Sequence, residues 1–413
     1  MNEAANRDPT AGSLEGYRVV DIGPRIASAF AAKHLAELGA EVVRIETPEP
    51  DLIRGTPPFV GEPEEECSAL HLYLNAGKRS VAFKYTAGKE LLWRLLSVAD
   101  AIINGHTPGE SEALGLTADK LAALNSPAVL IDVSTFGHTG PYRDYMGTDI
   151  TVLALGGLMY ITGDADSEPL APYGHLGEYQ LGLNAVIAAL VALFGRETTG
   201  IAQQADVAGM ETCATMLENG IGLHLVSGFV RRRYGNRAYS KTPTIDVYEC
   251  KDGFVSMCLP TEAQWASLCT VLGRLEWLDD ATLKDWPARE RRGEEIAAVI
   301  RGWCKERTKL EVFEVFQTHR MPLAPGYSLA DVLADPQHAA RQHFVKVNHP
   351  CAGEFQLPRL PFISSVTSAQ ESSAPLLGEH TCEVLQEWLG LSLQQVDQLG
   401  QSGVIYVVQG GKD

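Results

Sequence analysis

A strand–helix–strand pattern near the N-terminus restricts the folds open to this chain more than any other feature. Residues 18–22 (RVVDI) and 41–46 (EVVRIE) have the composition of buried strands, and a helical pattern over residues 27–38 stops at Gly39. A helical crossover of about a dozen residues joins parallel strands. The pattern therefore predicts an α/β fold with a Rossmann-like parallel sheet. Because the turn after the first strand (DIGPRIAS) lacks the G-x-G-x-x-G fingerprint, NAD is not expected as a cofactor.

Further strand segments extend the predicted sheet. The expected strands are residues 81–83, 101–104, 128–133 and 203–207, with helices at 88–98 and 210–224. Turns rich in glycine and hydroxyl side chains follow two of these strands, at 106–109 (HTPG) and 134–141 (STFGHTGP). In open α/β sheets, ligands bind at the edge formed by the carboxyl ends of the strands. We therefore expect a ligand site at this edge.

A change in pattern near residue 244 predicts a second, smaller domain. Lys-Asp-Gly at 251–253 lies between two short β runs and indicates a hairpin, and helical patterns follow at 265–272, 294–305 and 310–319. The predicted organisation is a large Rossmann-like domain over 14–209, a linker helix over 210–243, a small α+β domain over 244–347 and a return segment over 348–413. The return segment is Pro-rich and extended up to 375, with short helices at 381–389 and 392–399.

Composition excludes several classes of partner. The chain has 413 residues and a net charge of −18, which argues against nucleic acid and against an anionic membrane surface. Its eight cysteines are scattered without a C-x-x-C pair, and no histidine cluster has zinc spacing, so we expect reduced thiols and no metal. The longest apolar run, 181–194, is shorter than a membrane span. These features predict a soluble, cytoplasmic protein.

Residues 173–196 contain the most suggestive carboxylate. Glu178 follows Gly174 and Gly177 and stands where a helix should begin. Leu183, Ile187, Leu190, Val191 and Phe194 recur behind it at helical spacing, and alanines occupy the other faces, so the helix is predicted to be buried all round. The free N–H groups of such a helix start favour a negative charge. Glu178 is therefore either a reactive group or a first-turn residue that only stabilises its helix.

Several motifs, taken in order, carry a family resemblance. LEGYRVVDI, LAELGAEVVRIETP, NAGKRSVAF, TPGESEALGL, FGHTGPY, TTGIAQQADV and APLLGEH resemble segments of the family III CoA-transferases. This CaiB/BaiF group includes formyl-CoA and carnitine CoA-transferases and α-methylacyl-CoA racemase. The resemblance runs from Leu14 to about Ile405. It implies a large Rossmann-type domain, a small α+β domain and two chains that interlock as linked rings.

The resemblance implies covalent catalysis on an acyl-CoA. In the family an Asp attacks the thioester to give a mixed anhydride, and CoA then forms a thioester with the enzyme. Glu178 stands at the position of that Asp, and N–H groups at the start of its helix are expected to stabilise the oxyanions. The extra methylene displaces the carboxylate, and a displacement of about 1 Å can cost ~10²-fold in rate. Thr148 replaces a histidine of the racemase branch, so racemisation is not expected.

Three interpretations remain open at this point. In the first, Glu178 is active and the chain moves CoA between an acyl-CoA such as succinyl-CoA and a carboxylic acid. In the second, the chain is a silent subunit that pairs with an active homologue, as in benzylsuccinate CoA-transferase, which has two different homologous subunits. In the third, the scaffold serves a CoA-dependent lyase or dehydratase. The chain is accordingly expected to form a homodimer or a heterodimer with a homologous subunit.

Candidate CoA-binding residues come from the same resemblance. Arginine and lysine side chains on loops at the edge of the sheet suit the nucleotide phosphates of CoA. Pro24 to Ile26 stand where the family has the loop beside the adenine. Gly105, His106 and Thr107 replace the family's asparagine–aromatic–basic run, and Asn104 precedes them. His138 is either a residue that faces the thioester or a turn histidine bonded to the backbone. The candidates are Pro24, Arg25, Ile26, Arg44, Arg54, Lys78, Arg79, Asn104, His106 and His138. Met146, Met159, Tyr160, Met216 and Leu217 are candidates for an acyl pocket or for the core.

Overall fold

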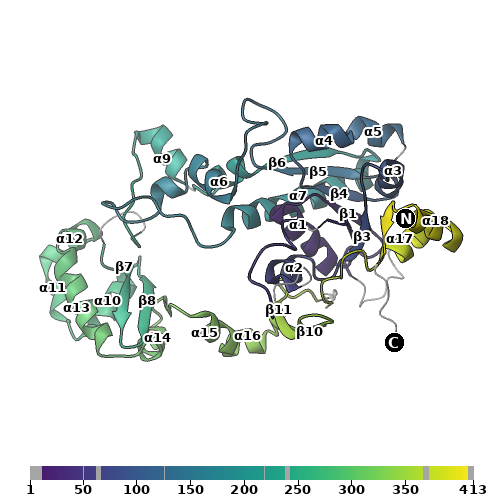
Figure 1. The fold of residues 1–413 in the computed structure, drawn as a ribbon. Coiled ribbons are helices and arrows are strands. Elements are labelled where there is room, and N and C mark those ends of the chain that lie inside the picture. Colours follow the sequence, from purple (N-terminus) through teal and green to yellow (C-terminus); the bar gives the residue numbers. More distant parts are fainter. Residues whose placement is uncertain are drawn as a thin grey trace. The chain divides into compact units, whose positions relative to one another are not determined.

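The computed structural model describes residues 12–49, 51–61, 67–124, 126–217, 219–237, 242–365 and 372–407. The chain divides into two compact units (Figure 1). The first combines the residues up to Gly156 with Pro172–Met216 and the segment from Ala339 onward, and the second combines Gly157–Ala171 with Leu217–His338.

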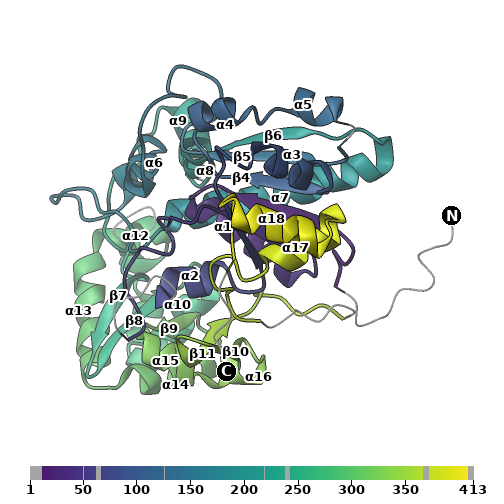
Figure 2. The same ribbon diagram turned by 45° about the vertical axis from the view of Figure 1, so that its right-hand side comes forward.

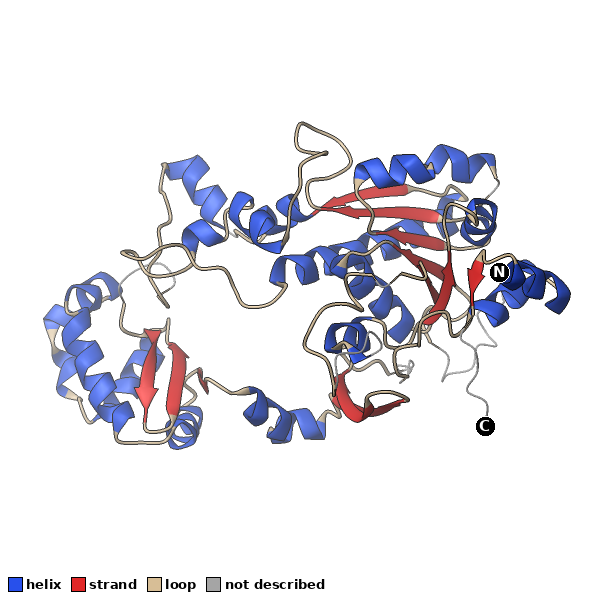
Figure 3. Cartoon of the chain, viewed as in Figure 1, coloured by secondary structure: helices blue, strands red, loops and turns tan. Residues whose placement is uncertain are grey.

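A seven-stranded sheet forms the centre of the first unit (Figure 3). Its strands, in spatial order, are β12 (Ile405–Tyr406), β3 (Arg79–Phe83), β2 (Glu41–Glu46), β1 (Arg18–Ile22), β4 (Ala101–Asn104), β5 (Val129–Ser134) and β6 (Gln204–Ala208). All neighbours are parallel except β12, which runs antiparallel to β3. The order 3-2-1-4-5-6 is that of the doubly wound Rossmann fold. The predicted parallel sheet is therefore confirmed.

Helices cover both faces of this sheet because successive strand residues point to opposite sides. Val19 of β1 faces α1 (Ile26–Glu37) and α7 (Leu176–Thr199) in one core. Val20 faces α3 (Lys89–Ser97), α17 (Thr381–Leu389) and α18 (Leu393–Gln401) in the other. Figure 2 shows α17 and α18 next to each other, and α17 contacts β3. β12 follows α18 in the chain and pairs with β3. The C-terminal segment therefore returns to the large unit.

Shorter elements complete the first unit. They are α2 (Ala69–Leu74), α4 (Pro108–Leu114), α5 (Ala118–Ala123), α6 (Asp149–Leu155), α8 (Gly209–Thr215) and the antiparallel hairpin of β10 (Phe344–His349) and β11 (Gly353–Pro358). The hairpin occupies part of the segment expected to be extended from residue 348, so the extended chain forms paired strands there.

The second unit is an α+β structure around a three-stranded antiparallel sheet. Its strands are β7 (Ile245–Cys250), β8 (Gly253–Cys258) and β9 (Leu323–Pro325). Its helices are η3 (Met159–Ile161), α9 (Asn219–Ser227), α10 (Glu262–Leu272), α11 (Glu276–Asp279), η4 (Ala281–Leu283), α12 (Trp286–Arg291), α13 (Gly293–Lys305), α14 (Lys309–Thr318), α15 (Leu329–Ala334) and α16 (Pro336–Ala340), which ends in the first unit. The hairpin predicted at Lys-Asp-Gly is present as β7 and β8.

The helix expected over 210–224 is two helices. α8 ends at Thr215 and α9 begins at Asn219, and the division between the two units falls between Met216 and Leu217. The single-helix prediction is wrong because the chain changes units at this point. The units also differ from the expected domain limits in another way, since residues 157–171 group with the second unit.

α7 is half buried, and the prediction that it is enclosed on all sides is wrong. Leu181, Ala185 and Ala189 pack in the core, but Leu183, Ile187, Val191 and Phe194 are 38–75% exposed. With 24 residues, the helix is long and apolar enough to cross a membrane by length and composition alone, contrary to our expectation. Half of that apolar window is buried within the unit, so α7 is a core helix with one apolar face uncovered.

Candidate active site around Glu178

The start of α7 is fixed by a carboxylate from the preceding helix. Asp149, the first residue of α6, accepts the backbone N–H of Glu178 through Oδ1 at 2.8 Å. A Cβ added at Gly177 would lie 2.9 Å from the same oxygen, so only glycine fits there without a shift. The N–H group of Glu178, expected to be available to an oxyanion, is therefore already bonded.

The side chain of Glu178 is buried and bonded through both oxygens. Oε1 accepts from Nη1 of Arg25 at 2.6 Å, and Oε2 accepts from the backbone N–H of Ala27 at 3.1 Å. Ala27 lies in the first turn of α1, whose N-cap residue, Arg25, makes no side-chain cap. The carboxylate of α7 thus takes the capping role for α1 and lies at the positive end of its dipole.

Arg25 connects this carboxylate to the edge of the sheet. Its Nη2 donates to Oγ1 of Thr135, which follows β5, at 2.7 Å. The turn after β1 approaches the turn after β4 so closely that a Cβ on Gly23 would lie 2.7 Å from the backbone of Gly105. Gly23 has φ +103°, which also favours glycine. β1 and β4 flank the point where the strand order reverses, which is where ligands bind in such sheets.

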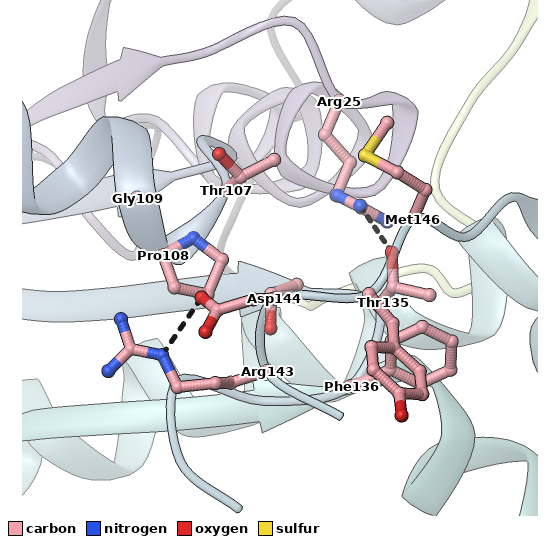
Figure 4. Close-up of a pocket in the computed structure, with 11 residues that line it drawn as sticks. Arg25, Thr107, Pro108, Gly109, Thr135, Phe136, Arg143, Asp144 and Met146 are labelled. Atoms are coloured by element: carbon pink, nitrogen blue, oxygen red, sulfur yellow. Dashed lines mark hydrogen bonds and ion pairs between the residues drawn. The ribbon is translucent and has the colours of Figure 1, made fainter. Parts of the chain in front are cut away.

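A cavity of about 170 Å³ lies beside Arg25 (Figure 4). It is lined by Arg25, Thr107, Pro108, Gly109, Ser134, Thr135, Phe136, Arg143, Asp144, Tyr145 and Met146. Glu178 is not among these described lining residues, although its partner Arg25 is. Anything that enters the cavity therefore meets Arg25 and Thr135 before it meets the carboxylate.

Three of the cations proposed for phosphate are enclosed and already paired. Arg44 bonds to Asp21 at 2.8 Å and also to Asp51, and it is 1% exposed. Arg54 is fully buried and binds both oxygens of Glu46, at 2.8 and 2.9 Å. Their guanidinium groups lie inside the unit, so the prediction that they face CoA is not supported.

Lys78 is the third of these cations. Its ammonium group donates to Asp21, to the carbonyl of Ala29 and to Asn75 at 2.8–2.9 Å, which uses all its protons. Burial lowers the pKa of Lys78 to about 8, against the attraction of Asp21. Burial would raise the pKa of Glu46 in the same cluster, but the bonds from Arg54 outweigh it and lower that pKa to about 2. The cluster is a buried ionic network of the fold.

Arg79, Pro24 and Ile26 differ in their exposure and in their partners. Arg79 pairs with Glu41, Glu383 and Glu387. Pro24 is exposed in the turn beside Arg25, and Ile26 is buried at the start of α1.

Two candidates, at the end of β4 and just after it, are buried together. Asn104 donates to Asp132 at 2.7 Å and to Ser111, and its oxygen lies 3.0 Å from Nδ1 of His106. Burial lowers the pKa of His106, which favours the neutral ring. His138 donates its backbone N–H to Asp206, while its Nε2 is buried without a hydrogen-bond partner among the described residues.

The structure thus pairs Arg25 with Glu178, whereas Arg44, Arg54 and Lys78 pair with other carboxylates. Sequence reasoning missed Thr135 and Arg143, although Thr135 carried a signal because it directly follows a strand at the carboxyl edge. Arg143 and Tyr145 lie in a loop with no recognisable pattern. Met146 lines this cavity, as one of the residues expected to line an acyl pocket.

A solved structure with the same fold and a family-level sequence match identify the protein family of this chain. The crystal structure of a CaiB/BaiF family protein from Brucella suis matches with a TM-score of 0.82 and 29% identity, covering 92% of this chain and 100% of that one. The model of CoA-transferase family III matches residues 14–381. This chain therefore belongs to CoA-transferase family III, as its motifs predicted, and it is a CoA-transferase chain.

Two relatives within the family are similar to this chain over almost its whole length. The chain is 30% identical to succinyl-CoA:(R)-benzylsuccinate CoA-transferase subunit BbsE of Thauera aromatica, over 95% of this chain and 98% of the relative. It is 31% identical to the succinyl-CoA–L-malate CoA-transferase beta subunit of Chloroflexus aurantiacus, again over 95% and 98%.

Proposed function

We propose that this chain moves CoA from succinyl-CoA or a similar donor to a carboxylic acid, with Glu178 as the nucleophile. The observation that carries the proposal is the fixed carboxylate of Glu178, held by Arg25 and the N-terminus of α1 behind a cavity at the strand-order reversal. The names of both relatives contain succinyl-CoA, which supports this donor.

The reaction consists of two exchanges at one carboxylate. Oε1 of Glu178 attacks the thioester carbonyl, the C–S bond breaks, and CoA thiolate leaves as the mixed anhydride forms. The thiolate then attacks the glutamyl carbonyl and releases the donor acid as its carboxylate, which leaves a glutamyl-CoA thioester. The acceptor carboxylate repeats these steps in reverse. Each step exchanges one anionic nucleophile for one anionic leaving group, so charge and atoms balance.

The two oxygens of Glu178 take different roles in this scheme. Oε1 lies on the side of Arg25, which lines the cavity, so it is the attacking atom. Oε2 becomes the carbonyl oxygen of the anhydride and carries the negative charge when thiolate adds. The N–H of Ala27 already points at this atom from 3.1 Å and stabilises that charge, as preorganised donors do.

We further propose that CoA lies along the turns after β1 and β4, with Pro24, Arg25 and Ile26 on one side and Thr107 to Gly109 on the other. Asn104, His106 and His138 support these turns. Arg79 begins β3 and donates to Glu41 at the start of β2, so it lies toward the opposite edge of the sheet from these turns, and no role in CoA binding is proposed for it. No role in CoA binding is proposed for Arg44, Arg54 or Lys78.

We also propose a cytoplasmic, interlocked dimer. The uncovered apolar face of α7, formed by Leu183, Ile187, Val191 and Phe194, supports a protein partner on this surface. A homologous subunit is one such partner, because both relatives are described as subunits. The scattered cysteines suit a reducing compartment.

A silent subunit is the second candidate function. Both oxygens of Glu178 are bonded within the chain, so the residue has a purely structural role available to it, joining α7 to α1. In that case an active homologous subunit would carry out the chemistry.

Mass spectrometry separates the two functions. The chain, alone and with any co-purifying homologue, is mixed with succinyl-CoA and its intact mass is recorded before and after hydroxylamine. We expect a hydroxylamine-sensitive, CoA-sized adduct on the peptide that contains Glu178, and no adduct in the Glu178→Gln control. An adduct only on the co-purified subunit would establish the silent role instead.

A further inference from the structure

The ion pair at the site poses a problem for any neutral substrate. Arg25 stands between the cavity and Glu178, and the exposed fractions of the two side chains are only 15% and 10%. When Oε1 of Glu178 attacks a thioester, the carboxylate loses the charge that pairs with Arg25. A poorly hydrated guanidinium left without an anion is strongly unfavourable. Only a group that brings its own negative charge can replace Glu178 at Arg25.

Thr135 keeps the guanidinium in place during such a replacement. It accepts from Nη2 at 2.7 Å, whereas Glu178 accepts from Nη1, so the two bonds are independent. One partner can change while the other holds the arginine at the cavity wall.

The other cation of the described cavity lining has no such constraint. Arg143 pairs with Glu112 and Asp144, whose side chains are 66% and 73% exposed. Exposed ion pairs of this kind contribute little and open easily. Arg25 is therefore the lining cation whose present partner is also the proposed nucleophile.

We propose that Arg25 selects acyl-CoA donors that carry a second carboxylate, by exchanging Glu178 for that carboxylate. The inference rests on the proposed function of Glu178 and assigns its substrate class. In a succinyl group two methylenes separate the thioester carbonyl from the distal carboxylate, which lets the carboxylate bind Nη1 while the carbonyl faces Oε1. Only a dicarboxylic acyl group gives Arg25 a charged partner in place of Glu178.

A binding experiment without chemistry tests the selection. In the Glu178→Gln background, the dissociation constants of succinyl-CoA and butyryl-CoA are measured by titration calorimetry. These donors have the same number of acyl carbons and differ in the terminal carboxylate. We expect succinyl-CoA to bind about ten-fold or more tightly, as for a hydrogen bond between charged groups. The preference should disappear in Glu178→Gln/Arg25→Met and return in part in Glu178→Gln/Arg25→Lys.

The matched control is Arg301→Met in the same background, because Arg301 is an exposed, ion-paired arginine of α13. It should keep the full preference. Equal binding of the two donors in Glu178→Gln, or a preference that persists in Glu178→Gln/Arg25→Met with native circular dichroism, would overturn the inference. Failure of the proposed function has a different signature, namely no hydroxylamine-sensitive adduct on the wild-type chain, and leaves these affinities measurable.

Discussion

Nη1 of Arg25 lies 2.6 Å from Oε1 of Glu178, although 153 positions separate the two residues in the chain. The contact joins the turn after β1 to the first turn of α7, and the cavity wall to the proposed nucleophile. Changes at either residue should therefore alter both stability and reactivity, and the two effects can be measured separately.

Glu178→Asp should lower the rate of adduct formation by about 10²-fold. The aspartate restores the residue type of the family, but its shorter side chain withdraws the carboxylate by about 1 Å from Arg25 and Ala27. Single-turnover labelling with succinyl-CoA gives this rate. An unchanged or higher rate would show that the geometry around residue 178 does not depend on these two bonds.

Glu178→Gln should destabilise the chain by about 1–3 kcal/mol, because the half-buried guanidinium of Arg25 loses its charged partner. Urea unfolding monitored by circular dichroism measures this free energy. The control is Glu15→Gln, at an exposed position in a turn, which should unfold like the wild type. A Glu178→Gln variant as stable as this control would contradict the structural importance of the pair.

Acid should weaken the buried ionic network through Glu46. The pKa of this residue is about 2 in the folded chain, against an ordinary value of 4.5 in the unfolded chain. Between these two pH values the folded state therefore binds fewer protons than the unfolded state. Its contribution, about 3 kcal/mol, is fully present above pH 4.5 and is lost as the pH falls towards 2. Glu46→Gln lacks this contribution, so the stability difference from the wild type should shrink over the same interval. A difference independent of pH would refute the assignment.

The sheet could be predicted because its signals are local. The hydrophobic patterns of β1, α1 and β2 each lie within about a dozen residues and predict these elements directly. The predicted bounds of β2 and β4 agree with the structure. Charge pairing could not be predicted in this way. Lys78 has the residue type and motif of a phosphate ligand, but its partner Asp21 lies 57 positions away, and only the fold brings the two together.

The site shows the same limit. Glu178 was identified from its place at a helix start, which is a local property. Its partner Arg25 was identified only as a possible CoA contact, since the sequence does not show that the turn after β1 meets the start of α7. The exposure of the outer face of α7 could not be predicted for a related reason, because an apolar stripe does not show whether its own chain or another chain covers it.

Thr135→Val should reduce the selectivity of the site more than its stability. Valine keeps the shape of threonine but cannot accept from Nη2 of Arg25, so the guanidinium loses the bond that holds it during exchange. We expect about a ten-fold loss in kcat/KM for succinyl-CoA, mainly through KM, and little change for butyryl-CoA. Thr139→Val, in the exposed loop that follows, is the matched control. Equal losses for both donors would mean that Thr135 acts only on folding.

Charges on the outer face of α7 should prevent the proposed dimer from assembling. Ile187 and Val191 are 60% and 62% exposed and lie one turn apart, whereas Ala185 and Ala189 on the opposite face pack in the core. Ile187→Asp/Val191→Asp therefore places two carboxylates on the uncovered face without disturbing the interior. Light scattering after size-exclusion chromatography should show a dimer for the wild type and a monomer for the double variant. Leu124→Asp, at another exposed apolar position, should remain dimeric. If the double variant kept the wild-type mass, the interface would have to lie elsewhere, and the apolar face would need a different partner.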